Sequence, residues 1–173
     1  MSKKVIGFTC SCFDLLHPGH VLMLEEAREN CDILVVGLQV DPTLDRPEKN
    51  KPIQSITERH IMLRSIKFVD SIFMYSTEAD LVELLRIVRP SIRFLGDDYR
   101  NKDYTGMDLG IPVHYIARQH TMSTTSLRGR VFCAVAAAAA ADAADGAPKL
   151  TTVRFTPVSV EPAPGEPAYG PLK

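Results

Sequence analysis

Short apolar runs alternate with longer amphipathic segments along the first two thirds of the chain. The runs are rich in β-branched and aromatic residues and have the length of buried strands. Between them, leucine, isoleucine and methionine recur with the 3.6-residue period of helices that bury one face. The expected strands are residues 5–9, 33–39, 71–75, 92–95 and 113–116, and the clearest helices are residues 21–30, 58–66 and 81–88.

This alternation of strands and helices predicts the fold class. Strands separated by single helices are typical of parallel sheets built with right-handed crossovers, which gives a three-layer α/β sheet of the doubly wound kind. In that architecture ligands bind at the carboxyl ends of the strands. The segments that follow the strands are therefore where functional side chains are expected.

The composition changes abruptly near the carboxyl end of the sequence. Residues 131–141 are dominated by alanine, which favours continuation of a helix. Prolines then recur and exclude a long helix, so an extended tail is expected, in which residues 151–160 could form one edge strand. We expect a main domain at residues 1–132 and an Ala/Pro-rich extension at residues 133–173.

Charge and cysteine content narrow the class of partner. The 173 residues include 20 basic and 21 acidic side chains, so bulk charge indicates no nucleic-acid or membrane surface, and an anionic ligand must be bound locally. The first apolar run is too short for a signal peptide or a membrane span, and we expect a cytoplasmic protein. The cysteines form no CxxC pair and are expected to be reduced; they are Cys10, Cys12, Cys31 and Cys133.

The first candidate site follows the first expected strand, where residues 12–20 read CFDLLHPGH before an amphipathic helix. Pro18 stiffens the turn, Gly19 lets the backbone approach a ligand, and the free N–H groups of the helix attract an anion such as phosphate. Two histidines three residues apart, His17 and His20, also fit a metal pair, acid–base catalysis or simple capping. A metal pair lacks a nearby third ligand. Imidazoles that donate to phosphate oxygens fit this position better.

A second candidate site follows the last expected strand, at another junction between a strand and a helix. Ser123, Thr124 and Thr125 bring hydroxyl groups to a helix N-terminus, and Arg118 adds a fixed positive charge. Together these groups could form a second phosphate cradle. A serine–threonine cluster at this place is also typical of an ordinary helix cap.

The third feature is the long loop at residues 41–57, which carries Arg46, Lys49 and Lys51. The helix and turn after it add Arg59 and Lys67. Connections of this length in compact domains often act as lids or binding segments. The alternative interpretation is a solvent-exposed charged loop that has no role in binding or catalysis.

Together these motifs resemble the cytidylyltransferase-like family, within the wider group of HxGH nucleotidyltransferases. The resemblance is strongest to the glycerol-3-phosphate cytidylyltransferase branch and covers about residues 3–131. It rests on four blocks in the order and spacing of the family: CFDLLHPGH at 12–20, ITERHIMLRSIKFVDSI at 56–72, LGDDY at 95–99 and MSTTSLRGR at 122–130.

The resemblance implies a Rossmann-like fold with a five-stranded parallel sheet. It also implies that a phosphate of the acceptor, for which glycerol 3-phosphate is the first expectation, attacks the α-phosphorus of CTP in line and releases pyrophosphate. Mg²⁺ is expected to enter with the nucleotide because it neutralises the triphosphate. A homodimer is expected, since dimers are common in the family.

The resemblance also assigns roles by position. His17 and His20 would hold the nucleotide phosphates in the transition state, and Arg118 would contact the β and γ phosphates. No protein side chain is assigned to a metal. The expected catalytic set is His17, His20, Lys49, Lys51 and Arg118; nucleotide binding adds Cys12, Phe13, Asp14, Gly96, Asp97, Met122, Ser123 and Thr124; substrate binding comprises Asp41, Lys49, Lys51, Arg59 and Lys67.

The sequence departs from the family pattern at three places. Ser11 stands where the family usually has glycine. Lys67 stands where the closest branch commonly has arginine. A lysine ammonium cannot make the bidentate phosphate contact of an arginine guanidinium. The lead into the serine and threonines reads Arg-Gln-His-Thr at residues 118–121 instead of an Arg-Thr-Gly-like sequence. These departures affect the phosphate contacts most directly.

Other functions fit the same motifs. An adenylyltransferase acting on a sugar phosphate or on flavin mononucleotide would use the same HxGH and STT elements. Residues 127–130, LRGR, are also similar to the phosphoethanolamine cytidylyltransferases. An alternative of another class is a non-catalytic nucleotide-binding or assembly protein that attaches through its alanine–proline tail.

Overall fold

The computed structural model describes residues 3–144. All five expected strands and the three clearest expected helices are present, so these predictions are confirmed. The elements are β1 (Ile6–Ser11), α1 (Pro18–Glu29), β2 (Ile33–Gln39), α2 (Ile56–Arg64), β3 (Ser71–Tyr75), α3 (Glu78–Val88), β4 (Ile92–Gly96), β5 (Val113–Ile116) and α4 (Thr124–Ala144), with short 3₁₀ turns η1 (Pro42–Leu44), η2 (Asp97–Tyr99) and η3 (Met107–Leu109).

The strands form one parallel sheet in the order β3-β2-β1-β4-β5, which confirms the Rossmann-like α/β fold. The chain builds outward from β1 to β3 on one side and then returns to the other side of β1. The direction of winding therefore reverses between β1 and β4. In open parallel sheets, the crevice at such a point is where ligands bind.

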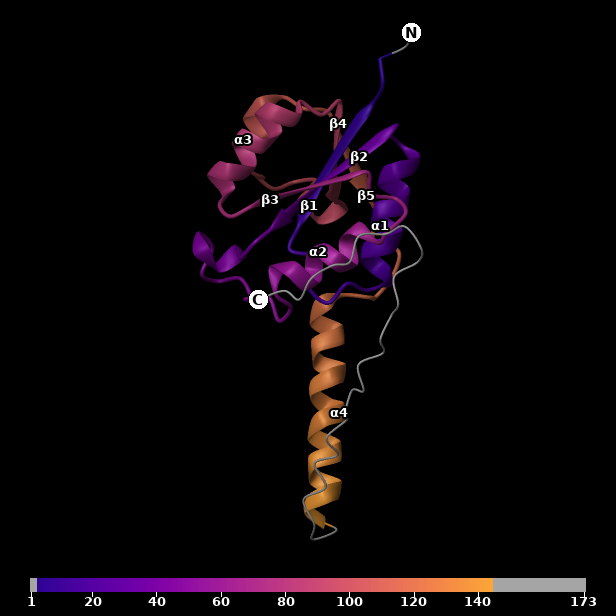
Figure 1. Cartoon of the computed structure of the whole chain (residues 1–173), viewed down its shortest axis with the longest axis vertical. Coiled ribbons are helices and arrows are strands. Elements are labelled where there is room, and N and C mark those ends of the chain that lie inside the picture. The colour runs from indigo at the N-terminus through magenta and orange to yellow at the C-terminus, as the bar shows by residue number, and fades with distance from the viewer. Residues whose placement is uncertain (1–2, 145–173) are drawn as a thin grey trace, which may run out of the picture. The chain divides into compact units, whose positions relative to one another are not determined.

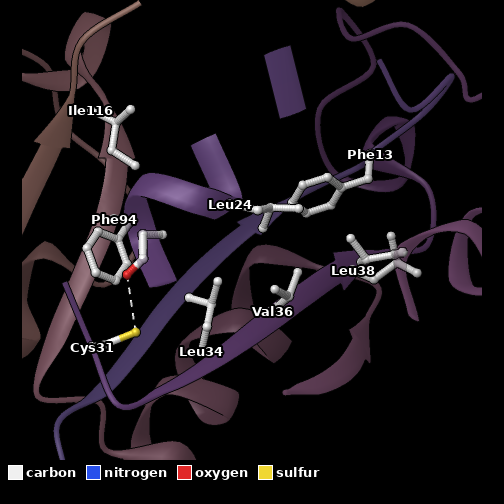
Figure 2. Packing of buried hydrophobic residues seen from close by; sticks show 10 residues of the cluster. Phe13, Leu24, Cys31, Leu34, Val36, Leu38, Phe94 and Ile116 are labelled. Atoms are coloured by element: carbon white, nitrogen blue, oxygen red, sulfur yellow. Dashed lines mark hydrogen bonds between the residues drawn. The ribbon is translucent and has the colours of Figure 1, made fainter. Parts of the chain in front are cut away.

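Helices cover both faces of the sheet (Figure 1). On one face α1 and α2 contribute Leu24, Ala27 and Leu63 to a buried cluster with alternate residues of β2. Figure 2 shows Leu24 and Val36 of this cluster. On the other face the leucines of α3 pack against a second cluster that includes Phe8. Burying these side chains on both faces provides the main favourable free energy of the fold.

The helices begin earlier than the hydrophobic pattern alone indicates, and polar caps are the reason. Each of the first three helices opens with a capping box, in which the side chains of the N-cap and N3 residues bond to each other's backbone N–H groups. In α2 and α3 the pairs are Ser55 with Glu58 and Thr77 with Asp80. In α1 the pair consists of His17 and His20, which is an unusual composition for a capping box. The residues that cap this helix are therefore also the central residues of the candidate site.

Two compact units can be distinguished, residues 1–133 and 134–173. Helix α4 confirms that the alanine-rich segment continues a helix, which extends to Ala144. The expected edge strand at 151–160 and the proline-rich tail lie outside the described residues. Within the described part of the chain, no helix has the length and apolar character needed to cross a membrane.

Candidate functional site

The carboxyl edge of the sheet gathers almost all of the expected site residues. The loop after β1 carries Cys12 to His20, the loop after β2 carries Asp41, Lys49 and Lys51, Gly96 ends β4, and Arg118 to Thr124 follow β5. Because the carboxyl ends of parallel strands lie at the same edge, four segments distant in sequence come together there. Only Lys67 lies elsewhere.

His17 and His20 form the cap of α1. His17 is the N-cap residue, and its Nδ1 accepts a hydrogen bond from the backbone N–H of Gly19 at 3.1 Å. His20 occupies position N3, and its Nδ1 accepts from the backbone N–H of His17 at 3.4 Å. The two imidazole rings stack with their centroids 3.9 Å apart. Both rings are therefore fixed at a helix N-terminus, where anions bind favourably.

These hydrogen bonds determine the protonation state of both imidazoles. Since each Nδ1 is an acceptor, the single proton of each neutral ring resides on Nε2, where it is available to a ligand. Burial lowers the pKa of His17, with smaller effects from His120 and Arg118. Burial and the neighbouring His17 and Arg118 lower the pKa of His20 to about 4. The pair therefore offers two neutral N–H donors near neutral pH.

The loop between β1 and α1 is strained. Phe13 and Leu15 both have a φ of 48°, in the left-handed region that residues other than glycine rarely adopt. Such a conformation costs about 1–3 kcal/mol per residue and persists only where surrounding contacts enforce it. Strain of this kind is concentrated at functional sites, and this loop carries the histidine pair.

Asp14 provides the contacts that hold the strained loop. Its buried carboxylate accepts hydrogen bonds from the backbone N–H groups of Ile53 and Gln54 and pairs with Arg128 at 2.5 Å. Burial opposes ionisation, but the hydrogen bonds from Gln54, Arg128 and Ile53 outweigh it and lower the pKa of Asp14. The side chain of Gln54 accepts from the N–H of Leu15 at 2.7 Å. Asp14, expected to bind the nucleotide, thus has its carboxylate committed to the protein.

Arg59, expected to bind substrate, has a structural position instead. Its side chain is only 2% exposed, and its guanidinium donates to the backbone carbonyls of Gln39 at 2.6 Å and Val40 at 2.6 Å. Further bonds reach the carbonyls of Cys12 at 2.8 Å and Gln54 at 3.1 Å. The planar guanidinium of Arg59 thus connects the end of β1, the end of β2 and the β2–α2 loop. Because it is buried, the guanidinium has no exposed surface that could bind a substrate.

Lys67 was expected to bind substrate, and the fold contradicts this prediction. The residue follows α2 and precedes β3, so it lies at the amino edge of the parallel sheet, opposite the histidine pair. Nearby Asp70 accepts a hydrogen bond from the N–H of Leu34, near the start of β2, which places the segment at that edge. The ammonium of Lys67 lies 4.8 Å from the ring centroid of Phe68. Sequence spacing along α2 could not reveal which end of the helix faces the site.

The other basic residues of the β2–α2 loop differ in exposure. Lys49 and Lys51 are exposed, and the ammonium of Lys51 is 4.0 Å from the carboxylate of Asp41. Hydrogen bonds from Thr43 lower the pKa of Asp41. Arg46, in contrast, pairs with Glu78 at 2.7 Å and is held within the protein. The two lysines are therefore the charges that this loop leaves available to a ligand.

The loop after β5 forms the opposite wall of the site. Arg118 is exposed, and Met122 is half-buried. The hydroxyl of Ser123 accepts from the backbone N–H of Ser126 at 3.1 Å, which caps α4 and leaves its own O–H proton free to donate. The hydroxyl of Thr124 donates to the backbone carbonyl of Asp14 at 3.2 Å, so its proton is already used.

The end of β4 contributes Gly96 and Asp97. A Cβ atom on Gly96 would lie 2.5 Å from a carboxylate oxygen of Asp98, an exposed side chain that can rotate away. Asp97 is exposed; its Oδ1 accepts a hydrogen bond from Nε of Arg100 at 2.8 Å and forms an ion pair with Nη2 of the same guanidinium at 2.8 Å. The charge of Asp97 is thereby balanced locally.

Three residues that the site predictions omitted are part of this arrangement. Gln54 and Arg128 secure the β1–α1 loop, and His120 packs against Gly19. Arg128 lies within the MSTTSLRGR block and His120 within the departing lead sequence, so both positions were visible in the sequence. Their roles depend on pairing between distant loops, which no local pattern indicates.

A bound metal would need a set of donor side chains. In the region from residue 3 to residue 144, no group of three or more His, Cys, Asp or Glu side chains is placed to hold one. Two carboxylates in the loops after β1 and β2 are occupied, Asp14 by Arg128 and Asp41 by Thr43. The candidate site therefore consists of hydrogen-bond donors and positive charge, which suits a phosphorylated ligand.

Comparison with known proteins agrees with this chemistry. The family model described as cytidylyltransferase-like matches residues 8–130. The bifunctional protein HldE of Aliarcobacter butzleri (strain RM4018) is 33% identical over 76% of this chain, and that of Caulobacter sp. (strain K31) is 37% identical over 73%. Each match covers 27% of the relative, so the chain spans about a quarter of the length of these proteins.

Solved structures show the same fold. The lipopolysaccharide core biosynthesis protein from Thermoplasma volcanium GSS1 has a TM-score of 0.56 and 27% identity, and the match covers 69% of this chain and 100% of that chain. The pantoate-beta-alanine ligase from Francisella tularensis has a TM-score of 0.50 and 19% identity over 70% of this chain and 62% of that chain, which shows likeness of fold alone.

Proposed function

This chain belongs to the cytidylyltransferase-like family of nucleotidyltransferases, and we propose that it transfers AMP from ATP to a sugar phosphate and releases pyrophosphate. The observation that supports this most directly is the capping box of α1, which leaves a neutral Nε2–H donor on each of His17 and His20. Two such donors at a helix N-terminus are suited to the oxygens of a transferring phosphoryl group.

The proposed reaction is a single displacement. An oxygen of the acceptor phosphate forms a bond to the α-phosphorus of the nucleotide while the bond from that phosphorus to the bridging oxygen breaks. Pyrophosphate leaves with the bonding electron pair. Mg²⁺ arrives as part of the nucleotide substrate and neutralises the leaving group. The protein contributes positioning and charge stabilisation, since no covalent intermediate is needed.

The remaining site residues have proposed roles in this reaction. Arg118 and the free hydroxyl proton of Ser123 contact the β and γ phosphates from the loop after β5. Lys49 and Lys51, the exposed charges of the β2–α2 loop, contact the acceptor phosphate or the triphosphate. Both walls are positive, which favours two anionic substrates in one site.

The choice of ATP and a sugar phosphate follows the comparisons. Among the proteins named above, the HldE proteins and the lipopolysaccharide core biosynthesis protein have the highest sequence identity to this chain. Lipopolysaccharide cores are built from sugars, so a protein of that process handles activated sugars. This favours the adenylyltransferase alternative over the first expectation from sequence, which was CTP with glycerol 3-phosphate. Transfer of CMP from CTP to glycerol 3-phosphate is kept as the second candidate function, and it is supported by the cytidylyltransferase-like family match and by the four sequence blocks.

A homodimer in the cytoplasm is part of the proposal. Strand β3 is an edge of the sheet and exposes Phe73 (45%) and Met74 (58%), and apolar edges of this kind are often covered by another chain. Sedimentation of the purified protein would measure its mass in solution. A monomer at all concentrations would contradict the dimer.

The deciding experiment measures pyrophosphate release with Mg²⁺, using ATP and CTP separately. The acceptors are heptose 1-phosphate, glycerol 3-phosphate, phosphoethanolamine, phosphocholine and flavin mononucleotide. Release with ATP and the sugar phosphate is expected. Release with CTP and glycerol 3-phosphate would replace this proposal by the second candidate. If no pair of nucleotide and acceptor gives pyrophosphate release while nucleotide binding is measurable, the non-catalytic alternative would be favoured.

A further inference from the structure

A third imidazole lies at the N-terminus of α1. A Cβ atom built on Gly19 would lie 2.5 Å from Cε1 and 3.1 Å from Nε2 of His120, and 3.0 Å from Cε1 of His17. Gly19 therefore leaves room for the ring of His120, which comes from the loop between β5 and α4. Three histidines from two distant segments meet at the helix end where a phosphate would bind.

The three rings differ in what occupies their nitrogens. In His17 and His20, Nδ1 accepts a backbone N–H and is committed to the helix cap. Nδ1 of His120 is buried and has no hydrogen-bond partner in the described part of the chain. Buried polar atoms without partners are uncommon because their desolvation is not compensated. Within the described part of the chain, His120 is thus the one ring of the three whose Nδ1 has no partner.

The charges around His120 differ before and after a nucleotide binds. His17, at the start of α1, lies close enough for its charge and that of His120 to interact, and Arg118 lies two residues before His120 in the same loop. The carboxylate of Asp14, in the β1–α1 loop, acts on His20, and Arg128 balances its charge. A bound triphosphate brings several negative charges to this end of α1, and negative charge nearby favours the positive form of an imidazole.

His17 and His20 cannot respond in the same way. A second proton on either ring would go to Nδ1 and would displace the backbone N–H that this atom accepts. The cap keeps both rings neutral, whereas Nδ1 of His120 accepts no backbone N–H, in the described part of the chain, that a second proton would displace. The structure thus distinguishes two rings held by the cap from one ring whose Nδ1 is not committed to it.

Resting on the proposed function, we propose that His120 is a third phosphate-binding histidine, which takes up a proton from solvent when the nucleoside triphosphate binds and contacts the triphosphate as an imidazolium. The positive charge appears only with the ligand. Binding of nucleotide is consequently coupled to proton uptake, and affinity rises as the pH falls from about 8 to 6.5, near the ordinary pKa of histidine.

The test is calorimetry of the full-length protein with α,β-methylene-ATP and Mg²⁺, without acceptor, so that no reaction occurs. Titrations in two buffers of different ionisation enthalpy give the number of protons taken up. The wild type is compared with His120→Gln, which keeps a donor near the position of Nε2 but cannot be charged. His60→Gln, a histidine of α2 outside the site, is the matched control.

We expect proton uptake by the wild type and by His60→Gln, and loss of most of it in His120→Gln. Affinity at pH 6.5 should fall about 10-fold in His120→Gln and much less at pH 8.5. Thermal melting checks that the variant is folded, and His120→Asn replaces it if it is not. Equal uptake and equal affinity in wild type and variant would overturn the proposal and leave His120 as a packing residue.

The same data separate this proposal from the proposed function. Proton uptake that depends on His120, in a protein that releases no pyrophosphate with any acceptor, would support the role of His120 and contradict nucleotidyl transfer. Pyrophosphate release by the wild type, together with the same proton uptake in His120→Gln as in the wild type, would support nucleotidyl transfer and contradict the role of His120. A wild type that binds no nucleotide would overturn both.

Discussion

At the residue scale, His17 and His20 combine two tasks, capping α1 through Nδ1 and offering Nε2–H to a ligand. The sequence Ser-x-x-Gln forms a capping box without any imidazole. The variants His17→Ser and His20→Gln therefore preserve the cap and remove one donor each. This allows the contribution to folding and the contribution to catalysis to be measured separately.

We predict that each of these variants lowers turnover about 100-fold or more, the usual cost of losing one transition-state donor, with little loss of stability. In contrast, His17→Ala should also cost about 1 kcal/mol of folding free energy because the cap is lost. Pyrophosphate release and urea unfolding measure the two effects. Unchanged turnover in both variants would remove the pair from the mechanism.

The depressed pKa of His20 makes the stability depend on pH. The folded protein binds a proton at His20 only near pH 4, whereas the unfolded chain does so near 6.5. Between these values the unfolded state binds more protons, so the stability is complete above about pH 6.5 and falls as the pH approaches 4. The contribution of His20 is up to about 3 kcal/mol.

His20→Gln is the matched control for this pH dependence, because glutamine keeps the cap and does not titrate. Urea unfolding at several pH values between 7 and 4 should show a smaller loss of stability in the variant than in the wild type. Parallel curves for the two proteins would contradict the assignment of this loss to His20.

At the element scale, the decisive contacts join loops at the carboxyl edge of the sheet. Arg59 links the ends of β1 and β2 to the β2–α2 loop through backbone carbonyls. Asp14 links the strained loop to that same loop and, through Arg128, to α4. Removing either residue releases several elements at once.

We predict that Arg59→Lys and Arg59→Met each lower the free energy of unfolding by about 2 kcal/mol or more. Lysine has one ammonium and cannot reach four carbonyls spread over three segments, whereas methionine leaves all of them unpaired. Denaturant unfolding measures the loss. A stable Arg59→Lys variant with a raised KM for the acceptor would instead restore the substrate-binding role expected from sequence.

At the scale of the whole molecule, the described buried side chains and the candidate site all belong to the unit at residues 1–133. Side chains 134–141 are exposed. We predict that a chain ending at Cys133 melts within about 2 °C of the full chain, because a shift of 1 kcal/mol would already move the midpoint by several degrees. It should also retain turnover.

Calorimetric melting and pyrophosphate release test this prediction, with the full chain as the reference. A midpoint lower by about 5 °C or more would mean that the unit at residues 134–173 stabilises the first. Loss of turnover without loss of stability would assign that unit a part in the reaction.

Much of the fold and the centre of the site were predictable from the sequence by itself. The alternation of apolar runs and amphipathic segments determined five parallel strands between helices, because side-chain periodicity is a local property of strand and helix geometry. The position of the histidine motif directly after the first strand then determined the edge at which it lies.

Only the tertiary structure decided how the remaining residues are used. Lys67 and Arg59 both follow the charged loop in sequence, yet one lies at the far edge of the sheet and the other is buried beneath the site. Arg128 and His120 gained their positions from contacts with a loop about a hundred residues earlier. Such pairings depend on how the folded sheet brings distant segments together, and no local periodicity carries that information.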